Sequence, residues 1–89
     1  MYISPMKTVS DLGEAVAVSR RALGLKQEEV ARQAGISRES LLRFERGQLP
    51  EFGTRKLLAV LAVLGLEIQF TQAGMSGSLD DLRRERGDA

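Results

Sequence analysis

The side chains best suited to chemistry in this sequence lie between Gln27 and Gly47, in the stretch QEEVARQAGISRESLLRFERG. Arg38 and Arg43 carry guanidinium groups that can donate two hydrogen bonds to guanine, a contact worth about 1–3 kcal/mol of discrimination. Glu39 could accept from a cytosine amino group, or it could hold Arg43 across one helical turn. For each arginine the alternative is a solvated side chain or a phosphate contact. This chemistry is recognition of a nucleic acid, and it needs an element that presents these side chains together.

Two short helices joined by a glycine turn would present them. Residues 27–34 and 38–45 have apolar side chains at the spacing of helices with one buried face; these are Val30, Ala31, Ala34, Leu41 and Phe44, and the last two continue an inward face from Ile36 in the turn. Gly35 can take the left-handed conformation that ends the first helix, and Ser37 stands where the second helix needs an N-cap. The charged face of the second helix then points outward. A tight helix pair of this kind is typical of a helix-turn-helix DNA reader.

The stretch resembles the Cro/repressor-like (XRE-type) helix-turn-helix family. The resemblance covers roughly residues 12–70, and its markers are Gln27, Ala31, Gly35, Leu41, Glu45 and Gly47. The Ala–Gly–Leu spacing alone is shared by many helical hairpins, but the whole set in this helical context is specific. One departure is Lys26, where such proteins often carry Ser or Thr as the N-cap. The resemblance implies an all-α, lambda-repressor-like bundle of four main helices, with one short C-terminal strand that pairs across a dimer.

The resemblance, together with the geometry of a helix in the major groove, assigns DNA contacts to two groups of residues. Base edges are reached by the second helix of the pair, whose candidate side chains are Ser37, Arg38, Glu39 and Arg43. The resemblance places a phosphate contact at Gln27, beside the N-terminus of the first helix, where free N–H groups favour an anion. Further phosphate contacts are expected from Lys26, Ser40, Arg46 and Gln48. Ser40 could equally be a plain surface serine.

The resemblance also implies an ion pair between Arg20, on an earlier helix, and Glu45, at the end of the recognition helix. We expect this pair to fix the recognition helix rather than to contact DNA. Removing either partner would leave a partly buried charge unmatched and should therefore destabilise the fold.

Composition limits the other classes of function. The 89 residues allow one small domain, and the apolar fraction of 43% is typical of a folded chain. The chain has no cysteine and no histidine, so we expect no disulfide, no zinc site and no imidazole chemistry. Since no nucleophile–base pair, phosphate loop or metal cluster stands out, we expect no enzyme, metal or cofactor. The longest apolar stretch, residues 57–66, is too short to span a membrane, and no secretory signal is recognisable.

The charge is distributed unevenly along the chain. The net charge is only +1, but residues 1–56 hold ten Lys or Arg against seven Asp or Glu. Residues 57–89 hold three Arg against five acidic residues. The positive excess therefore falls on the half that contains the helix pair, as a phosphate-binding surface requires, although solvated helices also carry mixed charge.

Two further helices flank the pair. Thr8 and Asp11 have the spacing of a capping box, which predicts a helix from there to about residue 23, with an inward face of Val9, Leu12, Val16 and Leu23. A fourth helix is expected over residues 54–64. It carries more apolar surface than one face of a small bundle needs, so part of this surface is expected to contact a second subunit.

Residues 66–71, LEIQFT, alternate strictly between apolar and polar side chains and predict a strand. A single strand has no partner in a helical domain, so antiparallel pairing with the same strand of a second subunit is expected. The dimer interface would then contain Leu58, Leu61, Leu66, Ile68 and Phe70. The alternative is an extended tail packed on its own domain.

The chain is thus expected to have a flexible arm over residues 1–7, a DNA-binding and dimerisation domain over residues 8–71, and a mobile charged tail over residues 72–89. We expect a homodimeric, sequence-specific transcriptional repressor that binds a near-palindromic operator in double-stranded DNA. It should be cytoplasmic, and associated with the nucleoid when bound to DNA.

Within the family, the sequence is most similar to HipB-type antitoxins, in the stretch PEFGT and in the ending LGLEIQF. This similarity implies a partner, a HipA-type serine/threonine kinase toxin, which the antitoxin dimer neutralises while the complex represses its own operon. Two alternatives stay open: a stand-alone XRE-type regulator without a toxin, and a protein-interaction module that does not read DNA. A kinase-sized protein encoded by the adjacent gene would favour the antitoxin.

Overall fold

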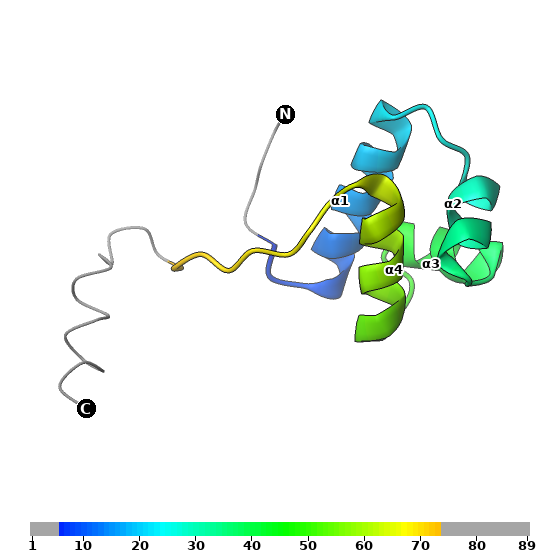
Figure 1. Ribbon diagram of the computed structural model, residues 1–89. Coiled ribbons are helices and arrows are strands. Elements are labelled where there is room, and N and C mark those ends of the chain that lie inside the picture. Colours follow the sequence, from blue (N-terminus) through cyan, green and yellow to red (C-terminus); the bar gives the residue numbers. More distant parts are fainter. Residues whose placement is uncertain (1–5, 74–89) are drawn as a thin grey trace, which may run out of the picture.

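The computed structural model describes residues 6–73, which form a bundle of four helices (Figure 1). The helices are α1 (Val9–Ala22), α2 (Gln27–Ala34), α3 (Arg38–Glu45) and α4 (Thr54–Leu64). These bounds confirm the four helices expected from the sequence and the helix-turn-helix arrangement of α2 and α3. Of the expected arm and tail, residues 1–5 and 74–89 lie outside the described part of the chain. None of the described helices is long and apolar enough to cross a membrane.

Local side-chain chemistry explains where the first three helices begin. The expected capping box opens α1: the Asp11 amide donates to Thr8 Oγ1 at 3.0 Å, and the Thr8 amide donates to Asp11 Oδ2 at 3.2 Å. Helix α3 begins at the expected cap, since Ser37 Oγ accepts from the Ser40 amide at 3.0 Å. At α2 the side chain of Lys26 makes no cap, and Glu29 instead accepts from the backbone amide of Lys26 at 3.2 Å. Each of these three helix starts therefore has at least one of its free amides satisfied.

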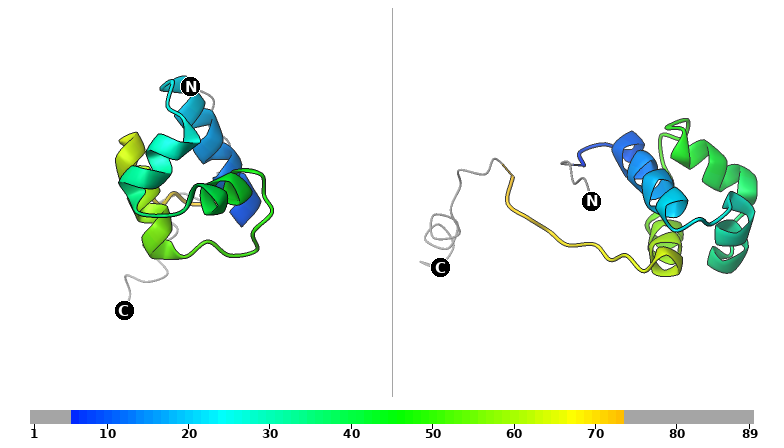
Figure 2. Two further views of the ribbon diagram at one scale, coloured as in Figure 1. Left: turned by 90° about the vertical axis from the view of Figure 1, so that its right-hand side faces the viewer. Right: turned by 90° about the horizontal axis from the view of Figure 1, so that it is seen from above.

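The core lies where all four helices meet (Figures 1 and 2). It contains Val16, Val30, Ala31, Leu41, Phe44, Phe52, Val60 and Leu64. The inward faces predicted for α2 and α3 are confirmed, because Val30, Leu41 and Phe44 are almost completely buried. The sequence analysis gave no role in the core to Phe52, yet its ring stacks on Phe44 with centroids 3.9 Å apart. This stack holds the loop between α3 and α4 against the end of the recognition helix.

The inward face predicted for α1 was wrong at its last position. Val9, Leu12 and Val16 face the core, but Leu23 is 55% exposed. The reason is that α1 ends at Ala22, so that Leu23 is its C-cap and not part of its inward face. The last buried residues of α1 are Ser19 and Arg20, and Leu25 packs against the core instead of Leu23.

Helices α1 and α3 approach closely at Gly13. A Cβ atom added at this position would overlap the carbonyl oxygen of Phe44. Because only a glycine has no Cβ, this residue allows the backbones of α1 and α3 to come into direct contact. The position of the recognition helix on the bundle is therefore set partly by a residue in the middle of α1.

The segment after α4 leaves the bundle on the side opposite α2 and α3, as both Figure 1 and the right-hand view of Figure 2 show. Gly65 ends α4 in the left-handed conformation, with a φ of 73°. Within residues 6–73 no segment forms a strand. The strand expected over residues 66–71 needs a second chain to pair with, so it stays a prediction.

Candidate nucleic-acid interface

The outward face of α3 carries the side chains that the sequence assigned to base contacts. Arg38, Glu39 and Arg43 are all exposed. Within residues 6–73 the single ion pair is that of Arg20 with Glu45, so neither arginine of this face is neutralised by a carboxylate. In particular, Glu39 does not pair with Arg43 one turn later, which was one of its two expected roles. The face therefore presents free guanidinium groups and one free carboxylate.

The two serines at the start of α3 are held by each other. Ser37 Oγ accepts from the Ser40 amide and donates to Ser40 Oγ at 2.9 Å. The hydroxyl proton of Ser37 is therefore engaged, and this residue can offer a base only its remaining acceptor capacity. Ser40 keeps its own hydroxyl proton, which can be donated to a phosphate.

A groove of about 530 Å³ lies between the end of α1, the start of α2 and α3. We call it the α2–α3 groove; it is lined by Arg20, Arg21, Lys26, Gln27, Glu28, Arg38, Leu42, Glu45 and Arg46. Because Arg20 and Glu45 neutralise each other, four cationic side chains are left against the carboxylate of Glu28. The groove also lies at the N-terminus of α2, where backbone N–H groups favour an anion. Its charge suits a phosphate group.

The structure brings several of the predicted phosphate contacts to this groove and leaves others outside it. Lys26, Gln27 and Arg46 line the groove, whereas Ser40 and Gln48 do not. Gln48 is exposed after α3, where its backbone amide donates to the Arg43 carbonyl at 2.9 Å. Its side chain therefore belongs to the loop that follows the recognition helix.

Two charged residues of the groove, Arg21 and Glu28, have no role among the DNA contacts predicted from the sequence. Arg21 directly follows Arg20 in the last turn of α1, and a basic residue at that position was a signal that could have been used. Glu28 is in the first turn of α2, where a carboxylate stabilises the helix whether or not a ligand is present. The sequence thus gave no reason to connect Glu28 with the interface.

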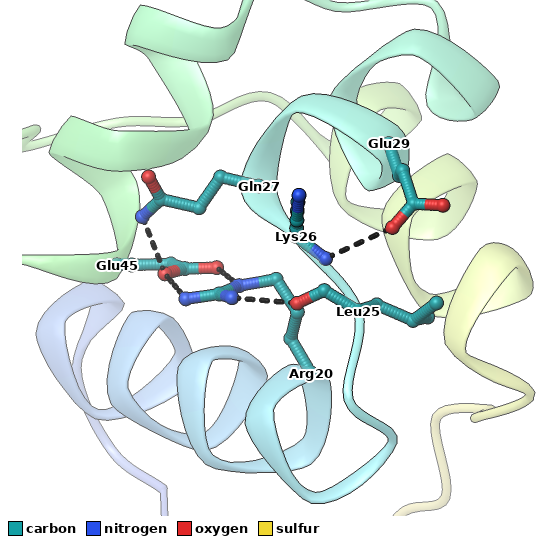
Figure 3. A network of polar contacts seen from close by, with 6 residues as sticks. All are labelled: Arg20, Leu25, Lys26, Gln27, Glu29 and Glu45. Carbon is teal, nitrogen blue, oxygen red and sulfur yellow. Dashed lines mark hydrogen bonds and ion pairs between the residues drawn. The ribbon is translucent and has the colours of Figure 1, made fainter.

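A buried polar network ties α1, α2 and α3 together beside this groove (Figure 3). Arg20 on α1 binds Glu45 on α3 with two hydrogen bonds: Nε donates to Oε2 at 2.7 Å, and Nη2 donates to Oε1 at 2.8 Å. Its Nη1 donates to the carbonyl of Leu25 at 2.8 Å. The side chains of Arg20 and Glu45 are only 10% and 2% exposed, respectively. The hydrogen bond to Glu45 raises the pKa of Arg20, although burial opposes this effect.

Gln27 joins the network from the first turn of α2. Its Nε2 donates to Glu45 Oε1 at 2.9 Å, and Figure 3 shows the amide oxygen turned away from the carboxylate. Because Glu45 can only accept, it fixes which end of the amide faces it. One N–H of Gln27 is left for another acceptor, such as a phosphate. Glu45 thus orients a residue of the groove while it anchors the recognition helix.

The residues assigned to the dimer interface lie on α4 and on the segment after it. Leu61 is half-buried, and the other four are exposed: Leu58, Leu66, Ile68 and Phe70. Phe70 is 95% exposed, which is unusual for a large aromatic side chain. The four exposed side chains are thus apolar groups that a single chain leaves in contact with water.

The described residues offer no alternative site for metal chemistry. Among residues 6–73 no group of three or more acidic or metal-ligating side chains could hold a metal ion. A second, smaller hollow of about 130 Å³ lies beside Phe44 and Phe52. Its other lining residues come from the starts of α1 and α4 and include the apolar side chains of Leu12 and Leu57.

Fold and site together define a helix-turn-helix protein with a basic recognition helix. Comparison with known proteins agrees: the model of the helix-turn-helix domain family matches residues 11–69. The chain belongs to this family. A curated relative, the uncharacterized HTH-type transcriptional regulator y4mF of Sinorhizobium fredii (strain NBRC 101917 / NGR234), is 33% identical over 69 residues. The match covers 78% of this chain and 90% of that protein.

Solved structures of HipB share the fold. HipB in the HipB-O4 20mer complex matches with a TM-score of 0.72 and 21% identity, covering 80% of this chain and 99% of that chain. A HipB variant with a serine-to-alanine substitution, in complex with an O2 20mer, matches with the same score and identity, over 81% of this chain and 99% of that chain. These comparisons confirm the expected helix-turn-helix family and a fold like that of HipB.

Proposed function

We propose that this protein is a sequence-specific DNA-binding repressor that acts as a homodimer. The observation that carries the proposal is the unpaired basic face of α3 beside the α2–α3 groove. In the complex, α3 enters the major groove, where Arg38, Glu39 and Arg43 meet base edges. Lys26, Gln27 and Arg46 bind the phosphates that flank the site, and Ser40 and Gln48 add further backbone contacts. The protein would act in the cytoplasm, on the nucleoid.

Dimerisation is proposed through α4 and the segment that follows it. Leu58 and Leu61 on α4, with Leu66, Ile68 and Phe70 beyond it, supply the apolar surface. A two-fold axis at this surface would pair the segments of residues 66–71 as antiparallel strands. Because the segment leaves opposite α2 and α3, it can contact a second subunit without covering the recognition helix. The two copies of α3 would then enter successive major grooves, about 34 Å apart, on a near-palindromic operator.

DNA binding is tested by changing the arginines of the recognition helix one at a time. Arg38→Ala and Arg43→Ala should each weaken binding to an operator selected by the wild-type protein, by about 5- to 150-fold for each half-site if the arginine makes a two-bond contact with guanine. Arg32→Ala is the matched control, because Arg32 is also exposed but lies outside the groove, in the last turn of α2. If both variants bind as tightly as the control, the protein is an interaction module and not a DNA reader.

The finer part of the proposal is that the protein is the antitoxin of a HipBA-like pair. Its partner would be a HipA-type serine/threonine kinase, neutralised by the dimer, with the complex repressing its own operon. The support is the likeness of the fold to HipB. A stand-alone regulator is the alternative, and the relative y4mF carries a regulator's name.

Capture of the protein at its natural level from its own cells separates these two functions. Mass spectrometry should find a kinase-like protein bound in a fixed ratio to the dimer. If wild-type protein retains only itself and DNA, the antitoxin role is wrong and a stand-alone repressor is left. The α3 variants serve here as a control, because loss of DNA binding should not remove a partner held by another surface.

A further inference from the structure

Glu39 is the one side chain on the outward face of α3 whose charge opposes DNA binding. It is exposed, and the described part of the chain gives its carboxylate no ion-pair partner. The other carboxylate of this helix, Glu45, is buried against Arg20 and presents no free charge. Glu39 therefore places an uncompensated negative charge one helical turn before Arg43, on the face proposed to approach the phosphates.

Such a charge weakens binding to every DNA sequence through repulsion by the phosphates. A carboxylate gains something in return only where a base offers it a hydrogen-bond donor. In the major groove, cytosine and adenine each present an amino group as donor, whereas guanine presents only acceptors. The adenine amino group lies beside the N7 acceptor, which repels a carboxylate, so the amino group of cytosine is the donor that fits. The gain is thus confined to sites with cytosine at one position, whereas the repulsion acts everywhere.

We propose that Glu39 is the specificity-determining residue of this recognition helix. It accepts a hydrogen bond from a cytosine amino group in each half-site, and it lowers the affinity for all other DNA. Arg38 and Arg43 attract DNA, and Glu39 restricts tight binding to sites that offer it a cytosine. The inference rests on the proposed function and adds to it the base that the operator must contain.

Two structural roles of a glutamate at this position must be distinguished from base recognition. The first, an ion pair with Arg43, is not formed. The second is stabilisation of the helix dipole, since Glu39 is in the first turn of α3. A dipole role predicts an effect on thermal stability and none on the choice of base.

Glu28 provides a matched control within the same chain. Like Glu39, it is exposed, is in the first turn of its helix and has no ion-pair partner among residues 6–73. It also lines the α2–α3 groove, so its carboxylate repels phosphates in the same way. It differs in its helix, because α2 is not the element that reaches base edges.

The experiment is selection of bound sequences from randomised duplex DNA by the wild-type protein, Glu39→Ala and Glu28→Ala. The selected operator and a mixed-sequence duplex are then titrated at several salt concentrations. Glu39→Ala should lose a cytosine preference at one position of each half-site and keep the other preferred bases. Its preference for the operator over mixed-sequence DNA should fall by about 30-fold or more, which is about fivefold or more for each of the two half-sites. Glu28→Ala should tighten binding to both duplexes by the same factor and keep the cytosine.

Both variants should also steepen the salt dependence, by about 1.8 in the slope of log K against log salt, because each removes one negative charge from each of the two subunits. The inference is overturned if Glu39→Ala keeps the cytosine preference, or if the two variants change the two affinities alike. A wild-type protein that selects no sequence would overturn the proposed function itself, and that result is visible before any variant is compared. Thermal unfolding of each variant, measured alongside, reports the contribution of the helix dipole.

Discussion

At the scale of single residues, Glu45 is the acceptor on which the polar network of the interface depends. It accepts from Arg20 twice and from Gln27 once, so one carboxylate joins three helices. All three donors lose their acceptor when this carboxylate is removed. A buried guanidinium without its partner is much more costly than the intact pair is favourable, because the desolvation of its charge is no longer offset.

We therefore expect Glu45→Ala to lower the free energy of unfolding by about 3 kcal/mol or more. Replacing both partners, as in Arg20→Met with Glu45→Met, should cost less than the sum of the single changes, because no charge is then left buried. Urea denaturation at one fixed protein concentration measures both, since dimerisation would make stability depend on concentration. Glu51→Ala, at an exposed residue, is the control. Strict additivity in the double variant would contradict this account.

The sequence predicts the ion pair of Arg20 with Glu45 but not all of the contacts around it. Arg20 and Glu45 follow from the resemblance, because their spacing matches the family pattern. The bond from Gln27 to Glu45 depends on the angle at which α2 meets α3, which no local pattern encodes. The stack of Phe44 on Phe52 is a similar case, since Phe52 is in a loop and has no helical periodicity to indicate its burial.

At the scale of helices, the contact of α1 with α3 depends on the glycine in the middle of α1. An alanine normally favours a helix by about 1 kcal/mol over glycine. At Gly13 the added methyl group would meet the Phe44 carbonyl, and neither backbone can move without disturbing the core. Sequence reading counts this glycine only as a weak position in a helix, because the close approach involves a residue 31 positions away.

Gly13→Ala should therefore be destabilising, by about 1–3 kcal/mol or more, although its effect on helix propensity has the opposite sign. Glu14→Ala, at the next residue, is the control, because this side chain is exposed and its replacement should change stability by less than about 0.5 kcal/mol. Thermal and urea unfolding of the two variants measure the difference. A Gly13→Ala protein as stable as the wild type would show that α1 and α3 are not in backbone contact.

The start of α1 gives the fold a dependence on pH. The backbone amides of Lys7 and Thr8 donate hydrogen bonds to the Asp11 carboxylate. These bonds, that of Lys7 above all, lower the pKa of Asp11 below its ordinary value of 3.8. A carboxylate whose pKa is lower in the folded state adds stability above the pKa of the unfolded state, and this contribution disappears as the pH falls through the folded pKa.

The difference in stability between the wild type and Asp11→Asn should accordingly be constant near neutral pH and shrink below about pH 4. Denaturation curves collected between about pH 7 and pH 2.5 measure this difference. Because Asp11→Asn does not titrate, it removes only the contribution of this carboxylate and leaves those of other acids in place. A difference that grows as the pH falls would mean that the carboxylate is not stabilised by the helix start.

At the scale of the whole molecule, the expected dimer would cover the apolar side chains of α4 and of residues 66–71 that one chain leaves exposed. The helix boundaries could be predicted to within a residue or two because they depend on local caps and periodicity. The pairing of residues 66–71 could not be tested in the same way, because a strand at an interface is defined by a partner and not by its own chain. Its alternation of apolar and polar side chains nevertheless makes a specific prediction about which face is covered.

Ile68 allows this prediction to be tested without disturbing the bundle. It is 44% exposed and belongs to the segment after α4, which leaves the bundle on the side opposite α2 and α3. A charge at this position, in Ile68→Glu, would be buried between two subunits without a partner, so we expect the dimer to dissociate while the helices stay folded. Leu23→Glu is the matched control: Leu23 is 55% exposed but lies at the end of α1, outside the proposed interface.

Sedimentation at several concentrations should show the monomer for Ile68→Glu and the dimer for Leu23→Glu, with equal helix content by circular dichroism. Loss of the dimer should also weaken operator binding and reduce the slope of log K against log salt by roughly half, because one copy of α3 then meets half of the phosphates. If Ile68→Glu stays dimeric, the subunits meet elsewhere. If it is monomeric but binds the operator as tightly as the control, DNA recognition does not depend on the two-fold arrangement, and the operator need not be palindromic.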